Sequence, residues 1–209
     1  MKKILVALLV SSMIMSLAAC GNKDSVSSSS ESNSSEVTSS SSVSEDNEEL
    51  EIPTEEVNEA EIAFYEAEED KVENAIKEAL ASDAEDKIQA VQDNVIKALG
   101  GRIEEEGNYI PSMPLENEML TEIYGLDMED IEKVIAEGPM ISNHVDTFIA
   151  VQAKEGKGED VETALNKYRD TLVTDTMQYP MNVAKINASR VYRDGDYVFF
   201  SILGAFYEE

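Results

Sequence analysis

The sequence predicts an α+β fold: a small antiparallel sheet made of two strands and a C-terminal hairpin, with a long helix on one face. An α-helical hairpin precedes this domain. Three observations support the prediction. Apolar residues recur at helical spacing before residue 101, a β-rich run covers 145–153, and an Asp-Gly turn separates two β-rich runs near the C-terminus. Strands that pair locally beside a packed helix are typical of α+β domains.

The predicted helical pair occupies residues 58–107. Apolar side chains of its first helix fall at helical spacing, with Glu69 interrupting the stripe: Ile62, Tyr65, Val72, Ile76 and Leu80. Ser82–Glu85 matches a capping box that would start the second helix, whose apolar face is Ile88, Val91, Val95 and Leu99. Gly100-Gly101 is a typical helix stop. Neither helix fully covers the other, so the pair is expected to dock on the following domain or on a partner.

The predicted α+β domain occupies residues 108–209. Prolines and glycine make 102–114 irregular, and a short helix follows with Leu115, Met119 and Ile123, ending at Gly125. A helical turn is expected at 127–132, an extended segment at 134–141 and a strand at 145–153. A long helix then begins at Glu159 with the core stripe Val161, Leu165, Tyr168 and Leu172. Pro180 breaks the chain before one more turn at 181–186.

The closing hairpin is the clearest local signal. Residues 189–193 and 196–203 flank Asp194-Gly195, a pair that favours a two-residue type I′ turn. The second run is rich in β-formers, which predicts that it lies centrally in the sheet.

These elements resemble a known family. Residues 123–127, the helix at 159–175, Tyr179-Pro180 and the Gly195–Val198 hairpin together resemble DUF4358, a family of lipoproteins from clostridia-like bacteria whose function is not known. The resemblance covers residues 117–204 and implies the layout and an envelope location. It implies no activity and no site residues.

Residues 1–19 are typical of a lipoprotein signal peptide. Two lysines precede an apolar stretch of about a dozen residues, whereas a membrane-spanning helix needs roughly 20. Leu17-Ala18-Ala19-Cys20 resembles the bacterial lipobox, in which the cysteine sulfur receives a diacylglycerol. Two acyl chains, palmitate for example, hold a protein firmly to a membrane. The alternative is a spare cysteine. With Cys20 acylated, this sole cysteine leaves no thiol for a disulfide.

Residues 20–57 are predicted to be the lipidated cysteine followed by a disordered acidic linker. Positions 25–44 contain 13 serines. Such a segment has too little apolar surface to offset the conformational entropy that it would lose on folding. The average reach of such a linker is about 30–37 Å. These features predict a protein anchored on the extracytoplasmic face of a Gram-positive cell membrane.

The net charge limits the classes of binding partner that are expected. Asp and Glu number 44 against 16 Lys and Arg, for a net charge of −28. Nucleic acid is excluded as a partner because phosphate binding needs a basic patch. The membrane through the diacylglyceryl anchor at Cys20, and an envelope protein or cell-wall component, remain as expected partners. Most acidic residues are interpreted as a solvated surface.

Three groups of side chains are candidate sites, each with a simpler explanation. His144, the sole histidine, lies in an expected turn with Asp146 nearby to orient it, or is a plain surface histidine. Asp194-Gly195-Asp196 looks like the start of a calcium loop but lacks the later ligand positions, so a hairpin turn is favoured. Asp127, Glu129 and Asp130 could chelate a cation, or could simply favour a helix N-terminus.

Tyr179, Tyr192 and Tyr197 could line a glycan or peptide groove. Tyr179 and Tyr197 are, on the simpler interpretation, core or edge residues. No cofactor, metal ligand or catalytic residue is predicted, and the ligand-binding residues are unknown.

Three functions are compatible with this pattern. The first is an envelope binding or interaction module, favoured because a tethered small domain lacks a catalytic signature. The alternative is an envelope hydrolase that uses two carboxylates. The third, the substrate receptor of a transporter, needs two lobes, and the folded part is small for that.

Overall fold

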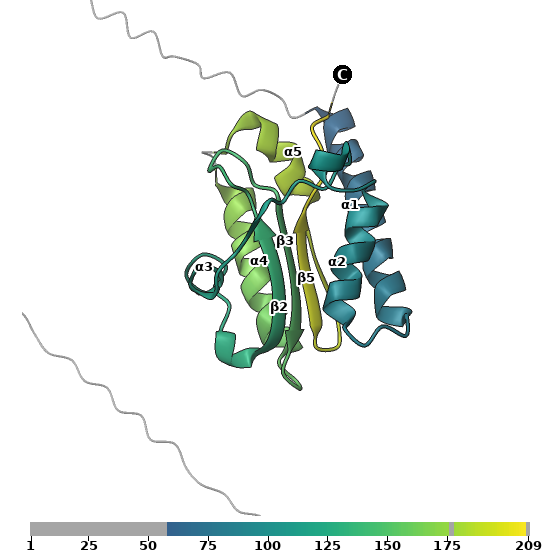
Figure 1. Cartoon of the computed structure of the whole chain (residues 1–209). Helices are drawn as coiled ribbons and strands as arrows, with labels where there is room; N and C mark the ends of the chain where they lie inside the picture. The colour runs from purple at the N-terminus through teal and green to yellow at the C-terminus, as the bar shows by residue number, and fades with distance from the viewer. Residues whose placement is uncertain (1–57, 176–177, 208–209) are drawn as a thin grey trace, which may run out of the picture. The chain divides into compact units, whose positions relative to one another are not determined.

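The computed structural model describes residues 58–175 and 178–207. In this part of the chain an antiparallel sheet lies between two helical layers, with a helical pair on one face and a long helix on the other (Figure 1). The predicted α+β class is confirmed, together with the long helix and the C-terminal hairpin. Cys20, the signal peptide and the linker lie outside the described residues.

The helical pair comprises α1 (Glu59–Ala81) and α2 (Lys87–Ala98). The second helix starts later than the capping box predicts. The Ser82 hydroxyl donates to the Ala79 carbonyl at 2.7 Å and so closes α1, whereas the Asp86 carboxylate accepts from the Gln89 N–H and caps α2. Gly100 and Gly101 have φ of 82° and 114°, which confirms the helix stop.

The segment between the pair and the sheet is partly ordered. It contains short 3₁₀ turns η1 (Ile103–Glu105) and η2 (Met128–Asp130), the strand β1 (Met113–Pro114) and the helix α3 (Asn117–Glu122). The strand β1 is not predicted from the sequence, because it has only two residues and gains its hydrogen bonds by pairing with residues 137–138. Strand pairing of this length depends on tertiary contact and leaves no periodic signal.

The main strands are β2 (Ile131–Gly138), β3 (Thr147–Ala153), β4 (Arg190–Asp194) and β5 (Tyr197–Ile202). The sheet order is β1-β2-β3-β5-β4 and all neighbours are antiparallel. The prediction that the last strand lies inside the sheet is confirmed. The extended segment expected at 134–141 begins earlier and ends at Gly138.

The β4–β5 turn differs from the predicted type. Asp194 pairs with Tyr197, so the two loop residues are Gly195 and Asp196. Gly195 has φ of 61°, and Asp196 is not among the residues with positive φ. One positive φ at the first loop position fits a type II′ turn, in which glycine occupies that position.

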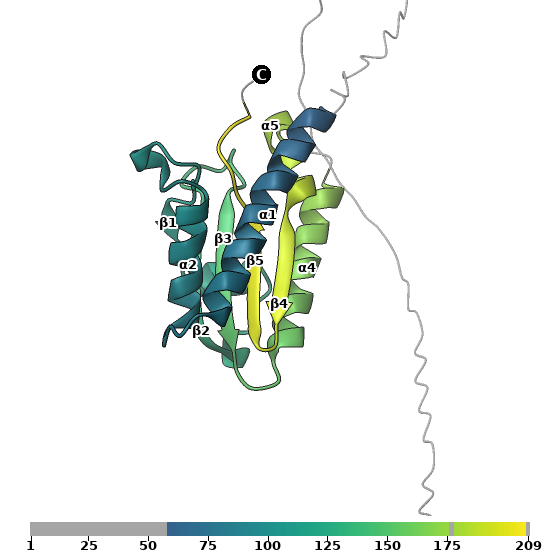
Figure 2. The same cartoon turned by 90° about the vertical axis from the view of Figure 1, so that its right-hand side faces the viewer.

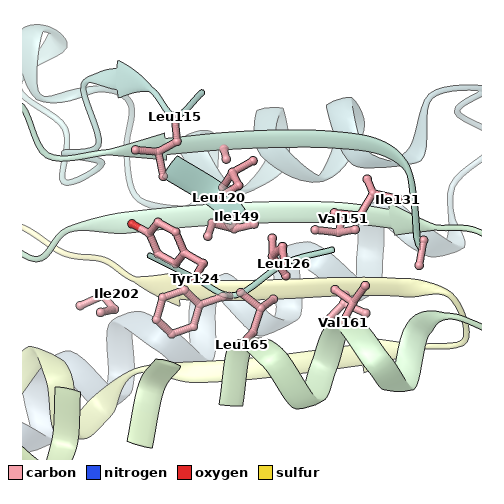
Figure 3. Close-up of a cluster of buried hydrophobic side chains, with 14 residues drawn as sticks. Leu115, Leu120, Tyr124, Leu126, Ile131, Ile149, Val151, Val161, Leu165 and Ile202 are labelled. Carbon is pink, nitrogen blue, oxygen red and sulfur yellow. The ribbon is translucent and has the colours of Figure 1, made fainter. Parts of the chain in front are cut away.

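Alternate residues of the central strands pack on opposite faces of the sheet. Ile149, Val151 and Ala153 of β3 join the cluster that faces α4 (Gly158–Thr174). Figure 3 shows Val161 and Leu165 of α4 pointing from the helix toward the strands. This period of two is what a sheet covered on both sides requires.

The other face of the sheet is covered by α1 and α2 (Figure 2). Phe148 and Ala150 of β3 and Phe199 of β5 pack there against the predicted apolar faces of both helices. The helical pair therefore docks on the following domain, the first of the two alternatives that the sequence left open.

The chain after α4 forms a longer helix than expected. Instead of one turn at 181–186, α5 runs from Pro180 to Ala188. Pro180 occupies the first turn, where its missing N–H has no partner to lose, so it starts the helix. Among the residues that the structure describes, no helix is long and apolar enough to cross a membrane.

Candidate functional site

One end of the domain carries no acidic or basic side chain on three converging segments. These are residues 138–145 between β2 and β3, residues 178–184 at the start of α5, and residues 202–207 after β5. Their 21 residues contain no Asp, Glu, Lys or Arg, although 29% of the chain is charged. We call this surface the uncharged end.

Large apolar side chains are exposed on the uncharged end. Met140 is 72% exposed, Ile141 56%, Tyr179 53%, Phe206 50% and Met181 43%. Exposed apolar groups that come from separate segments and gather at one place mark interaction surfaces more often than single exposed residues do. Tyr179 is therefore not a core residue, which corrects that part of the sequence interpretation.

Specific contacts hold the three segments together. The Asn182 side-chain amide donates to the Asn143 carbonyl at 3.0 Å. The rings of His144 and Phe206 lie 5.5 Å apart, and Tyr207 packs against Phe64 of α1 with centroids 5.6 Å apart. Figures 1 and 2 place α5, the start of α1 and the C-terminal segment together, opposite the β4–β5 turn.

A buried ion pair lies beneath this surface. The Lys185 ammonium of α5 is 2.6 Å from Oδ1 of Asp146, and their side chains are 1% and 0% exposed. The aromatic rings of Tyr65 and Phe206 have their centroids 5.4 and 4.9 Å from the ammonium. Each aromatic face attracts the cation in this site, which is shielded from water.

His144 completes the cluster but makes no hydrogen bond through Nδ1. That atom is 3.7 Å from Oδ2 of Asp146, and both atoms are buried without a hydrogen-bond partner, as is Oδ1 of Asn143. Asp146 is the orienting carboxylate that the sequence predicts for His144, and the structure brings these two residues together. His144 is half-buried, unlike the plain surface histidine of the alternative.

The environment of the cluster perturbs its tyrosine. Burial raises the pKa of Tyr65 to about 12. The hydrogen bond that its hydroxyl accepts from the Tyr207 N–H opposes this rise, and the carboxylates of Glu61 and Asp146 add to it. Tyr65 is therefore a neutral phenol throughout the physiological range. The cluster thus offers an amine, a carboxyl, an imidazole and a phenol in one dry site.

A second buried acid lies elsewhere, on α1. Glu69 is 1% exposed, and its carboxylate accepts hydrogen bonds from the Ser201 hydroxyl and from the Leu203 N–H at 3.1 Å. Burial raises its pKa to about 7 in spite of these two bonds and of the attraction of Arg190. Because both oxygens are bonded inside the core, this acid joins α1 to β5.

The acidic candidates have structural roles. Asp196 accepts from the N–H groups of Gly156 and Gly158 at 3.0 to 3.1 Å, which lowers its pKa and fixes the turn against the start of α4. Asp127 accepts from the Glu129 N–H and so caps η2, as the helix-terminus explanation predicts.

Asp130 pairs with Lys157 at 3.0 Å. Within the described residues no group of three or more His, Cys, Asp or Glu side chains could hold a metal ion.

The three tyrosine candidates do not form one groove. Tyr192 stacks on Phe199 at 6.3 Å, and both Tyr192 and Tyr197 pack against the cluster under the helical pair. Tyr179 directly precedes α5, at the uncharged end. Cys20, the predicted lipid attachment site, is outside the described residues.

Sequence reasoning missed Lys185 and underrated Asp146. A signal for Lys185 was present, because this lysine interrupts the apolar residues Val183, Ala184 and Ile186 within a short helical segment. Its partner lies 39 residues away in the chain. No local pattern identifies such a partner.

The comparisons identify one domain. Residues 109–203 match the family model described as Domain of unknown function (DUF4358). The match contains the sheet, α3, α4 and α5, and leaves out α1 and α2. Comparison with curated proteins and with solved structures gave no match.

Proposed function

We propose that this DUF4358 protein is a lipid-anchored interaction module on the extracytoplasmic face of the cell membrane, and that the uncharged end is its binding surface. The anchor is the diacylglyceryl group expected on Cys20, and the linker at 20–57 gives the domain its reach. The observation that carries the proposal is the gathering of exposed apolar side chains on three segments that contain no charged residue, in a chain of net charge −28.

Physical chemistry favours a protein partner at this surface. Exposed methionine adapts its shape to a partner, and aromatic side chains supply large contact area at low entropic cost. The charged remainder of the surface disfavours association with other acidic proteins and with a second copy of this chain. A surface of this composition selects an uncharged or apolar patch on an envelope protein.

The carboxylate hydrolase has less support. Among the described carboxyl groups with a clear shift, Glu69 is the one whose pKa is raised, and it is enclosed in the core. The groove along the outer face of α4 contains Glu159, Glu162 and Asp170, but these lie along a single helix. Glycoside hydrolysis needs two carboxyl groups that face each other across the scissile bond.

Site-specific photocrosslinking in intact cells tests the binding surface. A photoreactive residue at Met140 or Phe206 is expected to give a discrete adduct with an envelope protein. The matched control is Ile123, which is 50% exposed but lies at the end of α3, outside the uncharged end. Equal labelling from Ile123, or no adduct from Met140 and Phe206, contradicts the assignment.

A separate experiment tests the anchor. Cells grown on radiolabelled palmitate are expected to yield a labelled protein in the membrane fraction, whereas Cys20→Ser gives an unlabelled protein that is released. Label that persists in Cys20→Ser, or a wild-type protein without label, contradicts lipidation at this residue.

A further inference from the structure

The buried amine of Lys185 and the carboxyl of Asp146, beneath the uncharged end, are placed as the two partners of an amide. Lys185 Nζ and Asp146 Oδ1 are 2.6 Å apart, and both side chains are almost completely removed from water. The pair joins α5 to the residue just before β3. We propose that Lys185 and Asp146 form an intramolecular isopeptide bond, with His144 as the proton relay.

The burial of the two charged groups favours their conversion to an amide. Two charges taken out of water lose their hydration, and their mutual attraction repays this loss incompletely. Conversion of the ammonium and the carboxylate to a neutral amide removes both charges and releases one water molecule to the bulk. The fold also holds the reactants together, which replaces an encounter between separate molecules.

The atoms of the reaction balance within this site. The ammonium passes one proton to the carboxylate across the 2.6 Å contact, leaving a neutral amine beside a carboxylic acid. The lone pair of Nζ then attacks Cγ of Asp146 and forms the C–N bond. In the tetrahedral intermediate, His144 carries one proton from the nitrogen to Oδ2, and the proton first passed to Oδ1 moves to Oδ2 as well. The C–Oδ2 bond then breaks, and Oδ2 leaves as water with two protons that came from the ammonium. Oδ1 becomes the carbonyl oxygen of the amide.

The surroundings of Asp146 Oδ2 are suited to its departure as water. His144 Nδ1 is 3.7 Å from Oδ2, and neither atom has another hydrogen-bond partner. An imidazole at this place can take a proton from the attacking nitrogen and return it to the departing oxygen. The rings of Tyr65 and Phe206 enclose the amine and limit the access of water, which would reverse the reaction.

The amide would stabilise the fold in the way that a disulfide does in other proteins. Cys20 is the only cysteine, so a disulfide within the chain is ruled out. An amide between residues 146 and 185 closes a loop of 39 residues, as a disulfide would, and reduces the entropy of the unfolded chain. It would fasten two of the three segments that form the uncharged end.

Peptide mapping of the mature protein tests the proposal. Trypsin cuts after Lys133 and Lys154 and after Arg169 and Arg190, which releases residues 134–154 and 170–190. We expect these two peptides as one species, lighter than their sum by one water, with no cleavage after Lys185. Separate peptides of full mass, with cleavage after Lys185, overturn the proposal.

Two variants sharpen the test. Lys185→Arg keeps the positive charge and is expected to abolish the joined species. His144→Phe keeps a ring beside Phe206 and is expected to slow its appearance after synthesis at least tenfold, as loss of a general acid–base group does. An unchanged rate in His144→Phe overturns the role of His144, and a joined species in Lys185→Arg overturns the assignment of the amine.

Discussion

Asp146 and Glu69 are two carboxyl groups buried in the same domain, and they are accommodated by different means. Asp146 is 0% exposed and lies against the Lys185 ammonium, whereas Glu69 is 1% exposed and is held by the neutral donors of Ser201 and Leu203. The first acid has a cation of its own, and the second retains a proton near neutral pH because its pKa is raised to about 7. The comparison teaches that a buried acid can be accommodated either by a charged partner or by a proton of its own.

The largest expected effect follows from removal of the cation. Lys185→Met leaves Asp146 buried without its partner, and we expect the free energy of unfolding to fall by about 3–5 kcal/mol. Urea denaturation followed by circular dichroism measures this. The double variant Lys185→Met/Asp146→Leu is the control: it removes the unpaired carboxylate and is expected to recover that part of the loss, whereas loss of the proposed amide is common to both variants. A double variant as unstable as the single one contradicts the explanation.

The second prediction concerns Glu69 and pH. A folded-state pKa raised from 4.5 to about 7 means that the folded protein binds the proton more tightly than the unfolded chain. This contribution to stability is fully present below pH 4.5 and is lost as the pH rises toward 7 and beyond. The loss amounts to about 3 kcal/mol, from 1.36 kcal/mol per pKa unit.

Glu69→Gln checks this prediction, since the amide keeps the shape and does not titrate. We expect its free energy of unfolding to change less between pH 5 and pH 8 than that of the wild-type protein. The facing groups Glu68 and Arg190 stay in place in both proteins, so they cancel in the difference. Parallel pH profiles for the two proteins would rule out Glu69 as the source.

A smaller effect is expected at Glu137, a third acid that is only partly buried. It accepts two hydrogen bonds from the Arg102 guanidinium at 2.9 and 3.0 Å, and others from Gln92 and Tyr109. Because Arg102 is 37% exposed, Arg102→Met is expected to cost only about 1 kcal/mol in chemical denaturation. If Arg102→Met lowers the free energy of unfolding as much as Lys185→Met does, then solvent exposure does not determine how much each ion pair contributes to stability.

The smallest effect is expected at the exposed pair of Lys133 and Asp86, whose side chains are 43% and 45% exposed. Solvent screens this pair, so Lys133→Met should leave the melting temperature unchanged. Asp86→Ala should lower the melting temperature, because Asp86 also caps α2 through the Gln89 N–H. Equal melting temperatures in the two variants would show that the cap contributes nothing.

Much of the fold could be predicted because its signals are local. The stripes of α1, α2 and α4 and the terminal hairpin follow from the spacing of apolar residues, and each is present in the structure. The start of α2 was predicted wrongly because Ser82 and Asp86 both fit a cap. Which of the two residues caps α2 depends on how the connection between α1 and α2 packs in the folded protein.

The buried cluster was predicted less well, for a related reason. His144 and Asp146 were noticed because they are neighbours in the sequence. Lys185 comes from another helix and meets Asp146 only after β3 and α5 have docked. The gathering of residues 138–145, 178–184 and 202–207 on one end likewise requires the folded sheet.

The sequence by itself determined the apolar periodicity, the terminal hairpin, the acidic charge and the candidate lipid attachment site at Cys20, because each of these is encoded in neighbouring residues. Only the tertiary structure decided that the helical pair covers a face of the sheet, that Glu69 is enclosed, and that Lys185 meets Asp146. Those outcomes depend on contacts between residues far apart in the chain, and such contacts form only where the packed layers exclude water.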